Sequence, residues 1–455
     1  MNPVAAMTAA RPRAGAGEPG AAPAEPLYVW LFLAALAFTV FSGHTGLMGL
    51  PLSPDRPLLA FAVLLLLLDP ERERLRWRSF YVVAAVTILW TTLSWVSSGA
   101  LTDSLKFFAL FDRVAMPLAM FPLGALIFAT EHRRELLLRT VALLGIYLGF
   151  TGLFEYLRIG ALVWPGYIMA NPGTSTEIRA GGPWLFPEPL GLVANLAVFA
   201  SGLLVRTTKS LLWRVVGVLG LVGGLVASLV SMVRSVWLAL IVAGLVLGLM
   251  VPRLRRWLPL LLVASAVLIA AVLVLSPEFR DVLVARITTE RSVYDRQNTN
   301  EAALRIVAQL PLFGIGWGEF VNQSLLWVRQ ADTYPMTTVN IEVHNVFLSR
   351  AAETGILGAL LWALCFATGP LLGLLSTPRT ASARHWKLLG LAAFFVWFLP
   401  SLSSPNPYTT PNYLFWLVWG IAARGILVDL PPAPAVPAGA GEAADDADLR
   451  PRTPA

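Results

Sequence analysis

Long apolar stretches recur along the whole of this 455-residue sequence and restrict its fold more than any other feature. A helix needs about 20 apolar residues to cross the roughly 30 Å hydrocarbon core of a bilayer, and these stretches have that character. Their apolar residues run continuously instead of alternating with polar ones, which argues against a membrane β-barrel. Only 13% of the residues are charged, whereas a soluble domain usually carries about 25%. The sequence therefore predicts an all-α polytopic membrane protein.

About twelve transmembrane helices are expected, of which the second and fourth are short enough to be tilted or broken. The predicted spans lie near 27–43, 57–69, 79–97, 113–130, 136–158, 185–205, 211–230, 235–251, 257–275, 344–372, 386–401 and 411–428. We expect disordered tails at 1–26 and 429–455, helices 1 to 9 in 27–275, a large extracytoplasmic loop with short helices at 276–343, and helices 10 to 12 in 344–428. Both tails are rich in Ala, Pro and Gly and lack an apolar core.

The basic residues concentrate in every second loop between the predicted spans. These loops occupy 71–78, 131–139, 206–214, 252–256 and 378–387. Because cytoplasmic loops carry an excess of Lys and Arg, the alternation predicts that these loops and both termini are cytoplasmic. The net charge of +7 then follows from membrane topology, so we expect no nucleic acid among the partners.

His344 stands at the start of the tenth predicted span, on the extracytoplasmic side. One interpretation is that it caps a helix or lies at the lipid interface. The other is chemical: an imidazole with an ordinary pKa near 6.5 is mostly neutral at neutral pH, and the positive end of a helix dipole lowers that pKa further. A neutral imidazole can accept a proton from a poor nucleophile, so His344 is the candidate catalytic base.

Arg234 is the strongest candidate for binding an anion on the same side. It falls at the turn between two apolar spans within 211–250, where few polar residues surround it. A cation there is costly unless it reaches the interface or meets an anion, and an anionic headgroup is the better explanation. The guanidinium fork also fits phosphate oxygens. The predicted anion-binding set is Arg234, Arg286, Arg291, Arg305 and Arg179; the long loop also contains Arg280 and Arg296.

The sequence argues against metal, nucleotide and disulfide chemistry. The outer loops show no cluster of His, Asp and Glu with metal-ligand spacing, and no phosphate-binding Walker motif is present, so no metal and no cofactor are expected. Cys365 is the single cysteine, which excludes an intrachain disulfide. The stretch "PLFGIGWGEF" at 311–320 follows no predicted strand, so we interpret it as a tight turn packed under an aromatic pair, not as a nucleotide site.

Four short motifs, in this order and on this topology, resemble the O-antigen ligase superfamily of bacterial inner-membrane glycosyltransferases. They are "RSVW" at 234–237, "PLFGIGWGEF" at 311–320 with Arg305 before it, "HNVFL" at 344–348 and "ETGILG" at 353–358. The large loop between the ninth and tenth spans also matches, and the resemblance covers about 27–428. The sequence departs from the family pattern at Val343, where a small residue usually precedes the histidine, and at Val307, where an aromatic often follows the arginine.

The resemblance implies a GT-C-like membrane fold and a multi-pass enzyme of the bacterial inner membrane with its active site on the periplasmic side. It implies transfer of a glycan from undecaprenyl diphosphate by a metal-independent, inverting mechanism. His344 is then the catalytic base, and the predicted arginines bind the diphosphate. The expected partners are the carrier-linked glycan donor, the lipid A–core acceptor and membrane lipids.

Several functions share these motifs. The compact chain with one dominant outer loop favours an O-antigen ligase, which acts in lipopolysaccharide maturation. A polymerase of O-antigen or exopolysaccharide and a protein O-oligosaccharyltransferase are the alternatives within the family. A transporter of anionic solutes is the alternative from a different class. It predicts charges inside the spans and internal repeats, whereas the informative charges here gather on one side.

Overall fold

The predicted all-α architecture is confirmed by the computed structural model. It describes residues 25–50, 52–99, 103–170, 179–275, 277, 280, 281, 284, 288, 291–332, 334–337 and 340–429. Within this part of the chain, the one strand-like pairing is an isolated bridge between Leu75 and Val428. The main helices are α1 (Leu27–Phe38), α2 (Asp55–Leu68), α3 (Ser79–Ser97), α4 (Ser104–Leu110), α5 (Met116–Ile127), α6 (Glu131–Tyr156), α7 (Tyr167–Ala170), α8 (Pro187–Thr207), α9 (Leu211–Val230), α10 (Arg234–Met250), α11 (Pro252–Leu275), α13 (Arg291–Gln309), α14 (Phe320–Trp327), α15 (Val346–Phe366), α16 (Leu372–Leu375), α17 (Ala381–Ser401), α18 (Thr409–Ala422) and α19 (Arg424–Leu427).

Six helices of the described chain are long and apolar enough to cross a membrane. They are Ser79–Ser97, Ser104–Ile127, Glu131–Tyr156, Pro187–Thr207, Leu211–Val230 and Val346–Leu375. Two shorter apolar helices, Leu27–Phe41 and Arg234–Met250, accompany them. Helical structure lies at each of the twelve predicted ranges, but the number of spans, the GT-C-like arrangement and the periplasmic position of the large loop stay predictions.

The fourth predicted span begins earlier in the structure than the expected residue 113. Asp103 caps the helix, because its side chain accepts hydrogen bonds from the backbone N–H groups of Leu105 and Lys106. The helix then continues from Ser104 to Ile127 through a π-helical turn, η3 (Phe111–Ala115). Charged residues in this first part interrupt the apolar pattern, which is why the sequence suggested a later start.

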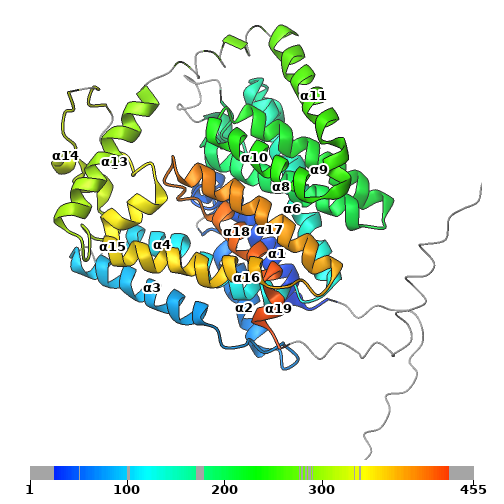
Figure 1. Cartoon of the computed structure of the whole chain (residues 1–455), viewed down its shortest axis with the longest axis horizontal. Coiled ribbons are helices and arrows are strands. Elements are labelled where there is room, and N and C mark those ends of the chain that lie inside the picture. Colours follow the sequence, from blue (N-terminus) through cyan, green and yellow to red (C-terminus); the bar gives the residue numbers. More distant parts are fainter. Residues whose placement is uncertain are drawn as a thin grey trace, which may run out of the picture.

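Glycine allows the central helices to approach each other closely, as is common where helices pack within membranes. A Cβ on Gly149 of α6 would lie 2.3 Å from the Cα of Gly223 of α9. Between α18 and α5, a Cβ on Gly420 would lie 1.9 Å from the carbonyl oxygen of Phe121. Figure 1 shows the resulting bundle, with α13 and α14 gathered on one side of it beside the start of α15.

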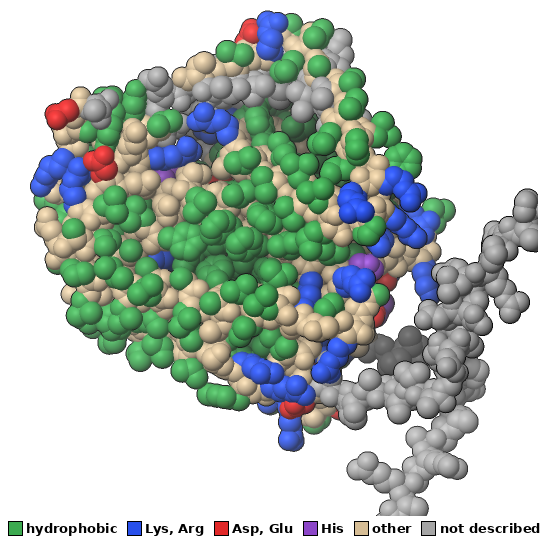
Figure 2. Space-filling view, viewed as in Figure 1, with side chains coloured by type: hydrophobic (Ala, Val, Ile, Leu, Met, Phe, Trp, Pro, Cys, Tyr) green, Lys and Arg blue, Asp and Glu red, His purple; other side chains and the backbone are tan. Residues whose placement is uncertain are grey.

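Two of the predicted basic loops, 131–139 and 378–387, contact each other, and basic loops also contact the chain near both of its described ends. Arg133 donates to Glu25 near the start of the described chain (2.6 Å), and Arg134 donates to Ser382 (3.2 Å). Near the other terminus, Arg76 pairs with Asp429 at 2.5 Å. Figure 2 shows a broad hydrophobic band with Lys and Arg side chains gathered on both sides of it, as expected for a protein that spans a membrane.

The glycine-rich turn and the "ETGILG" motif form one local structure. Helix α15 is interrupted at Gly355, whose φ is 74°. The backbone N–H of Ile315 donates to the carbonyl of Ala352 (3.0 Å), and that of Ile356 donates to the carbonyl of Pro311 (2.8 Å). The turn therefore supplies hydrogen-bond partners for backbone groups that have no partner within the interrupted helix. The predicted tight turn is present, and Phe313 stacks on Trp90 with ring centroids 4.7 Å apart.

Replacing Gly355 by alanine is expected to destabilise the protein on the order of 4 kcal/mol or more. A Cβ there would lie 1.9 Å from the carbonyl oxygen of Leu312, and the positive φ disfavours any side chain. Thermal unfolding in detergent measures the loss. Gly244→Ala is the control, because a Cβ on Gly244 in α10 meets nothing within 4 Å. Equal unfolding temperatures for the two variants would contradict the structural role of Gly355.

Candidate functional site

The candidate base lies in residues 342–345, "EVHN", and each of its three neighbours in this segment has contacts of its own. We call these four residues the histidine segment. Glu342 accepts a charged hydrogen bond from Arg113 at 2.8 Å. Val343 is fully buried in a small hydrophobic cluster beneath α13 and α15. The side chain of Asn345 caps α15 by accepting from the N–H of Leu348 at 3.1 Å. His344 is thus fixed between a salt bridge, a buried valine and a helix cap.

The burial of Val343 explains one departure from the family pattern. The side chain packs with Ala302 and Ile306 of α13 and with Ala352 of α15, which are all fully buried. A larger residue before the histidine therefore fills space between two helices.

The environment of His344 favours the neutral imidazole. Burial lowers the pKa of His344, the positive charge of Arg296 lowers it further, and the charges of Asp295 and Glu342 oppose the shift. Among the described residues, the Nδ1 atom of His344 has no hydrogen-bond partner. A neutral imidazole has the protonation state that a general base needs at neutral pH.

Helix α13 carries two of the charges that act on His344, those of Asp295 and Arg296. The charge of Arg296 acts on His344 and also on Glu188, which lies in the first turn of α8. The hydroxyl of Ser404 donates to Glu188. Asp295 accepts a hydrogen bond from Thr337 at 2.5 Å, which holds the start of α13 against the segment before His344. The His344 cluster therefore comprises Glu188, Asp295, Arg296, Glu342 and His344.

The structure separates the predicted arginines into different environments. Arg305 donates to Glu301 (2.8 Å) and to the carbonyl of Trp327 (3.1 Å), so its guanidinium joins α13 to α14. Arg234 is the exposed first residue of α10. Arg286 and the side chain of Arg291 lie outside the described residues.

Arg179 and Arg234 belong to neighbouring segments. The N–H of Ala180, next to Arg179, donates to the carbonyl of Val230 at the end of α9 (3.0 Å). The start of α10 also packs on α8, because a Cβ on Gly191 would lie 2.6 Å from Val236. Gly191 is three residues, hence about one helical turn, beyond Glu188. Arg234 is therefore carried by a helix that begins beside the α8 turn that holds Glu188.

Five members of this arrangement were not in the site predicted from the sequence: Arg113, Glu188, Asp295, Arg296 and Glu342. Of these, Arg296 had been noted only as a further arginine of the long loop. For Glu188 and Arg113, the sequence contained a feature that could have identified them. Glu188 lies near the start of an apolar span in "FPEPLG", and Arg113 lies at the start of another in "FDRVAM". Ionisable residues in apolar spans are costly and usually have a partner or a function. Glu342 had no such signal, because it lies in a polar loop.

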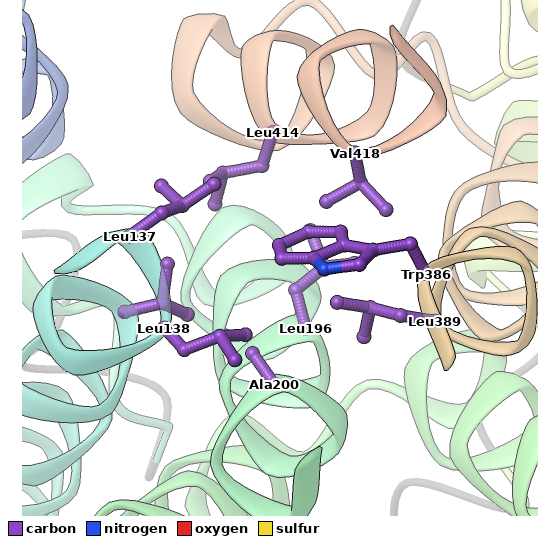
Figure 3. A pocket seen from close by; sticks show the side chains of 9 residues that line it. Leu137, Leu138, Leu196, Ala200, Trp386, Leu389, Leu414 and Val418 are labelled. Atoms are coloured by element: carbon purple, nitrogen blue, oxygen red, sulfur yellow. The ribbon is translucent and has the colours of Figure 1, made fainter. Parts of the chain in front are cut away.

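The apolar void in Figure 3 is separate from these charged groups. Its lining comes from α6, α8, α17 and α18 and includes Leu137, Leu196, Trp386 and Leu414. All of the surface that lines it is apolar. It offers no group that could bind a phosphate or activate a hydroxyl.

The residues that the structure describes contain no group of three or more His, Cys, Asp or Glu side chains placed to hold a metal ion. The carboxylates of the His344 cluster lie instead beside arginines: Glu342 pairs with Arg113, and Glu188 is near Arg296.

Comparison with known proteins identifies one domain in the chain. Residues 218–363 match the family model described as O-Antigen ligase. The matched range includes Arg234, Arg296, Arg305 and His344, whereas Arg113 and Glu188 lie outside it. No curated protein matches the chain.

Proposed function

We propose that this chain, which belongs to the O-antigen ligase superfamily, transfers a glycan from undecaprenyl diphosphate to lipid A–core oligosaccharide. The reaction takes place at the periplasmic face of the bacterial inner membrane, and the basic loops and both termini are cytoplasmic. The observation that carries this proposal is the His344 cluster, where the charge of Arg296 acts on a half-buried histidine within the matched domain.

The proposed reaction needs a base and an anion-binding group, and this chain offers both. His344 accepts the proton of the acceptor hydroxyl as its oxygen attacks the anomeric carbon of the donor sugar. The bond between that carbon and the phosphate oxygen breaks, and the electron pair leaves with undecaprenyl diphosphate. The carbon is attacked from the side opposite the leaving group, which inverts its configuration. Arginine side chains stabilise the charge that develops on the diphosphate.

Arg296 and Arg234 are the arginines best placed for this role. The charge of Arg296 already acts on His344. Arg234 begins a helix beside the α8 turn that carries Glu188. Arg179, Arg286 and Arg291 stay candidates for additional phosphate contacts, and Arg305 is occupied by Glu301 and Trp327.

Reconstitution with defined substrates tests the proposal. The purified protein is placed in vesicles with a carrier-linked glycan and lipid A–core, and the products are separated by mass. A ligase yields glycan attached to lipid A–core and needs that acceptor. A polymerase instead yields longer carrier-linked chains when lipid A–core is omitted, and this result would replace the ligase assignment. Absence of any glycan product would contradict the function as a whole.

Glycan transfer is expected to continue in excess EDTA. Arginine side chains hold the leaving diphosphate in the proposed mechanism, so a divalent cation is not required for charge stabilisation. The measurement compares initial rates before and after chelation in the same vesicles. A loss of activity that Mg²⁺ or Mn²⁺ restores would show that a metal ion takes part.

A further inference from the structure

The π-helical turn η3 places two charged neighbours in ion pairs with two different segments. Asp112 accepts a hydrogen bond from Arg56, at the start of α2, at 2.7 Å. Arg113 donates to Glu342 of the histidine segment at 2.8 Å. A π-turn widens a helix locally and changes the direction of its side chains, and such turns are frequent at functional sites. The turn thus connects α2 and the histidine segment to the α4–α5 helix.

We propose that the ion pair between Arg113 and Glu342 positions His344 for proton transfer, so that both are positioning residues of the site. This inference rests on the proposed function. Glu342 is two residues before His344, and the segment between them has little freedom because Val343 is fully buried and Asn345 caps α15. Fixing Glu342 therefore fixes the backbone from which His344 projects.

The pair also sets the electrostatic environment of the imidazole. The carboxylate of Glu342 raises the pKa of His344 against the larger lowering effects of burial and Arg296. The positive charge of Arg113 partly neutralises the Glu342 carboxylate and so weakens its effect on the pKa of His344. The other charged or titratable groups around this region are Asp295, Arg296, Glu188, Tyr408, Arg350 and Glu353.

The chain provides a matched control for this ion pair. The side chains of Arg113 and Glu342 are 30% and 32% exposed, and those of Arg56 and Asp112 are 36% and 16% exposed. The two pairs have nearly equal lengths and share the same π-turn, but only one of them reaches the histidine segment. Arg56→Gln therefore removes a comparable ion pair without releasing Glu342.

Turnover measures the positioning effect. Arg113→Gln and Glu342→Gln are each expected to lower kcat by roughly 10- to 100-fold, because small misplacements of a catalytic group have effects of that order. The double variant should lose no more than either single variant, since both remove the same interaction. Arg56→Gln should retain turnover. Losses that add in the double variant, or an equal loss in Arg56→Gln, would overturn the proposal.

Titration of His344 by NMR tests the same pair without any activity assay. The chain has four histidines, so the signal of His344 is identified by its loss in His344→Gln. Glu342→Gln should lower the pKa of His344 because a negative charge is removed. Arg113→Gln should raise it because that charge loses its counterion, and Arg56→Gln should leave it unchanged. An unmoved pKa in the first two variants overturns this inference, whereas a wild-type protein that titrates as expected but transfers no glycan overturns only the proposed function.

Discussion

Replacing His344 by glutamine is expected to lower the rate of glycan transfer by about 10²- to 10⁴-fold, the range that general-base catalysis contributes. Glutamine keeps a polar side chain of similar size but cannot accept the proton of the attacking hydroxyl. The fold should survive, because the segment is held by Arg113 at Glu342 and by the cap at Asn345. Transfer by the purified variant is measured with carrier-linked glycan, and thermal unfolding confirms that the protein is intact.

His44 provides the matched control for this substitution. It is half-buried, burial lowers its pKa, and its ring stacks on Tyr167 with centroids 5.9 Å apart. It therefore shares the protonation state of His344, but the arginine and carboxylates that act on His344 are not among the causes of its pKa shift. His44→Gln should retain turnover. Near-wild-type turnover in His344→Gln, or an equal loss in both variants, would show that His344 is not the base.

The dependence of the rate on pH follows from the same residue. The pKa of His344 is lowered, so the imidazole is neutral at pH 7 and protonates only below its ordinary value of 6.5. Transfer should be constant through neutral pH and then fall about tenfold for each pH unit below the pKa of His344, because only the neutral base is active. The His344→Gln variant should lose this acidic decrease. A decrease that persists in the variant would come from another group.

Much of the fold could be predicted from the sequence because hydrophobicity over about 20 residues is a strong local signal. Helical structure lies at all twelve predicted ranges, and a hydrogen bond from Arg134 to Ser382 joins two of the basic loops that the charge pattern grouped together. Boundaries were less certain. The helix that begins at Ser104 is capped by Asp103. The charged residues that follow lower the local hydrophobicity, so the predicted start of this span was placed too late.

The candidate site was only partly accessible to sequence reasoning. His344 and Arg234 stood out because each interrupts or borders an apolar run. Arg113 and Glu342 are 229 residues apart, and only the folded chain brings them together. The break at Gly355 also needs a partner far along the chain, namely the turn at Pro311, to which the N–H of Ile356 is bonded. Such long-range contacts leave no local pattern in a single sequence.

Arg296→Ala is expected to lower turnover by about 10²- to 10³-fold, the loss seen when one preorganised stabilising group is removed from a charged transition state. Its charge acts on both His344 and Glu188, and the proposed mechanism puts the leaving diphosphate near this base. Arg296→Lys should recover only part of the rate, because an ammonium group cannot offer the planar fork of guanidinium. Arg234→Ala and Arg234→Lys should follow the same order if Arg234 shares the diphosphate.

Arg305 is the control on the same helix. It lies nine residues beyond Arg296, about 13.5 Å along α13, and it is bonded to Glu301 and Trp327. Arg305→Ala should therefore lower the unfolding temperature more than it lowers kcat. The prediction that Arg305 binds the diphosphate would be supported if this variant lost turnover as strongly as Arg296→Ala while its stability was unchanged.

A second measurement separates phosphate binding by Arg296 from its effect on the base. The positive charge of Arg296 lowers the pKa of His344, so its removal should raise that pKa and move the acidic decrease in rate to higher pH. Above this region the imidazole is neutral in both proteins, and a rate difference that remains there reports lost stabilisation of the diphosphate. If raising the pH restored the full wild-type rate, Arg296 would act only on the protonation of His344, and the clamp would have to consist of Arg234 and the other outer arginines.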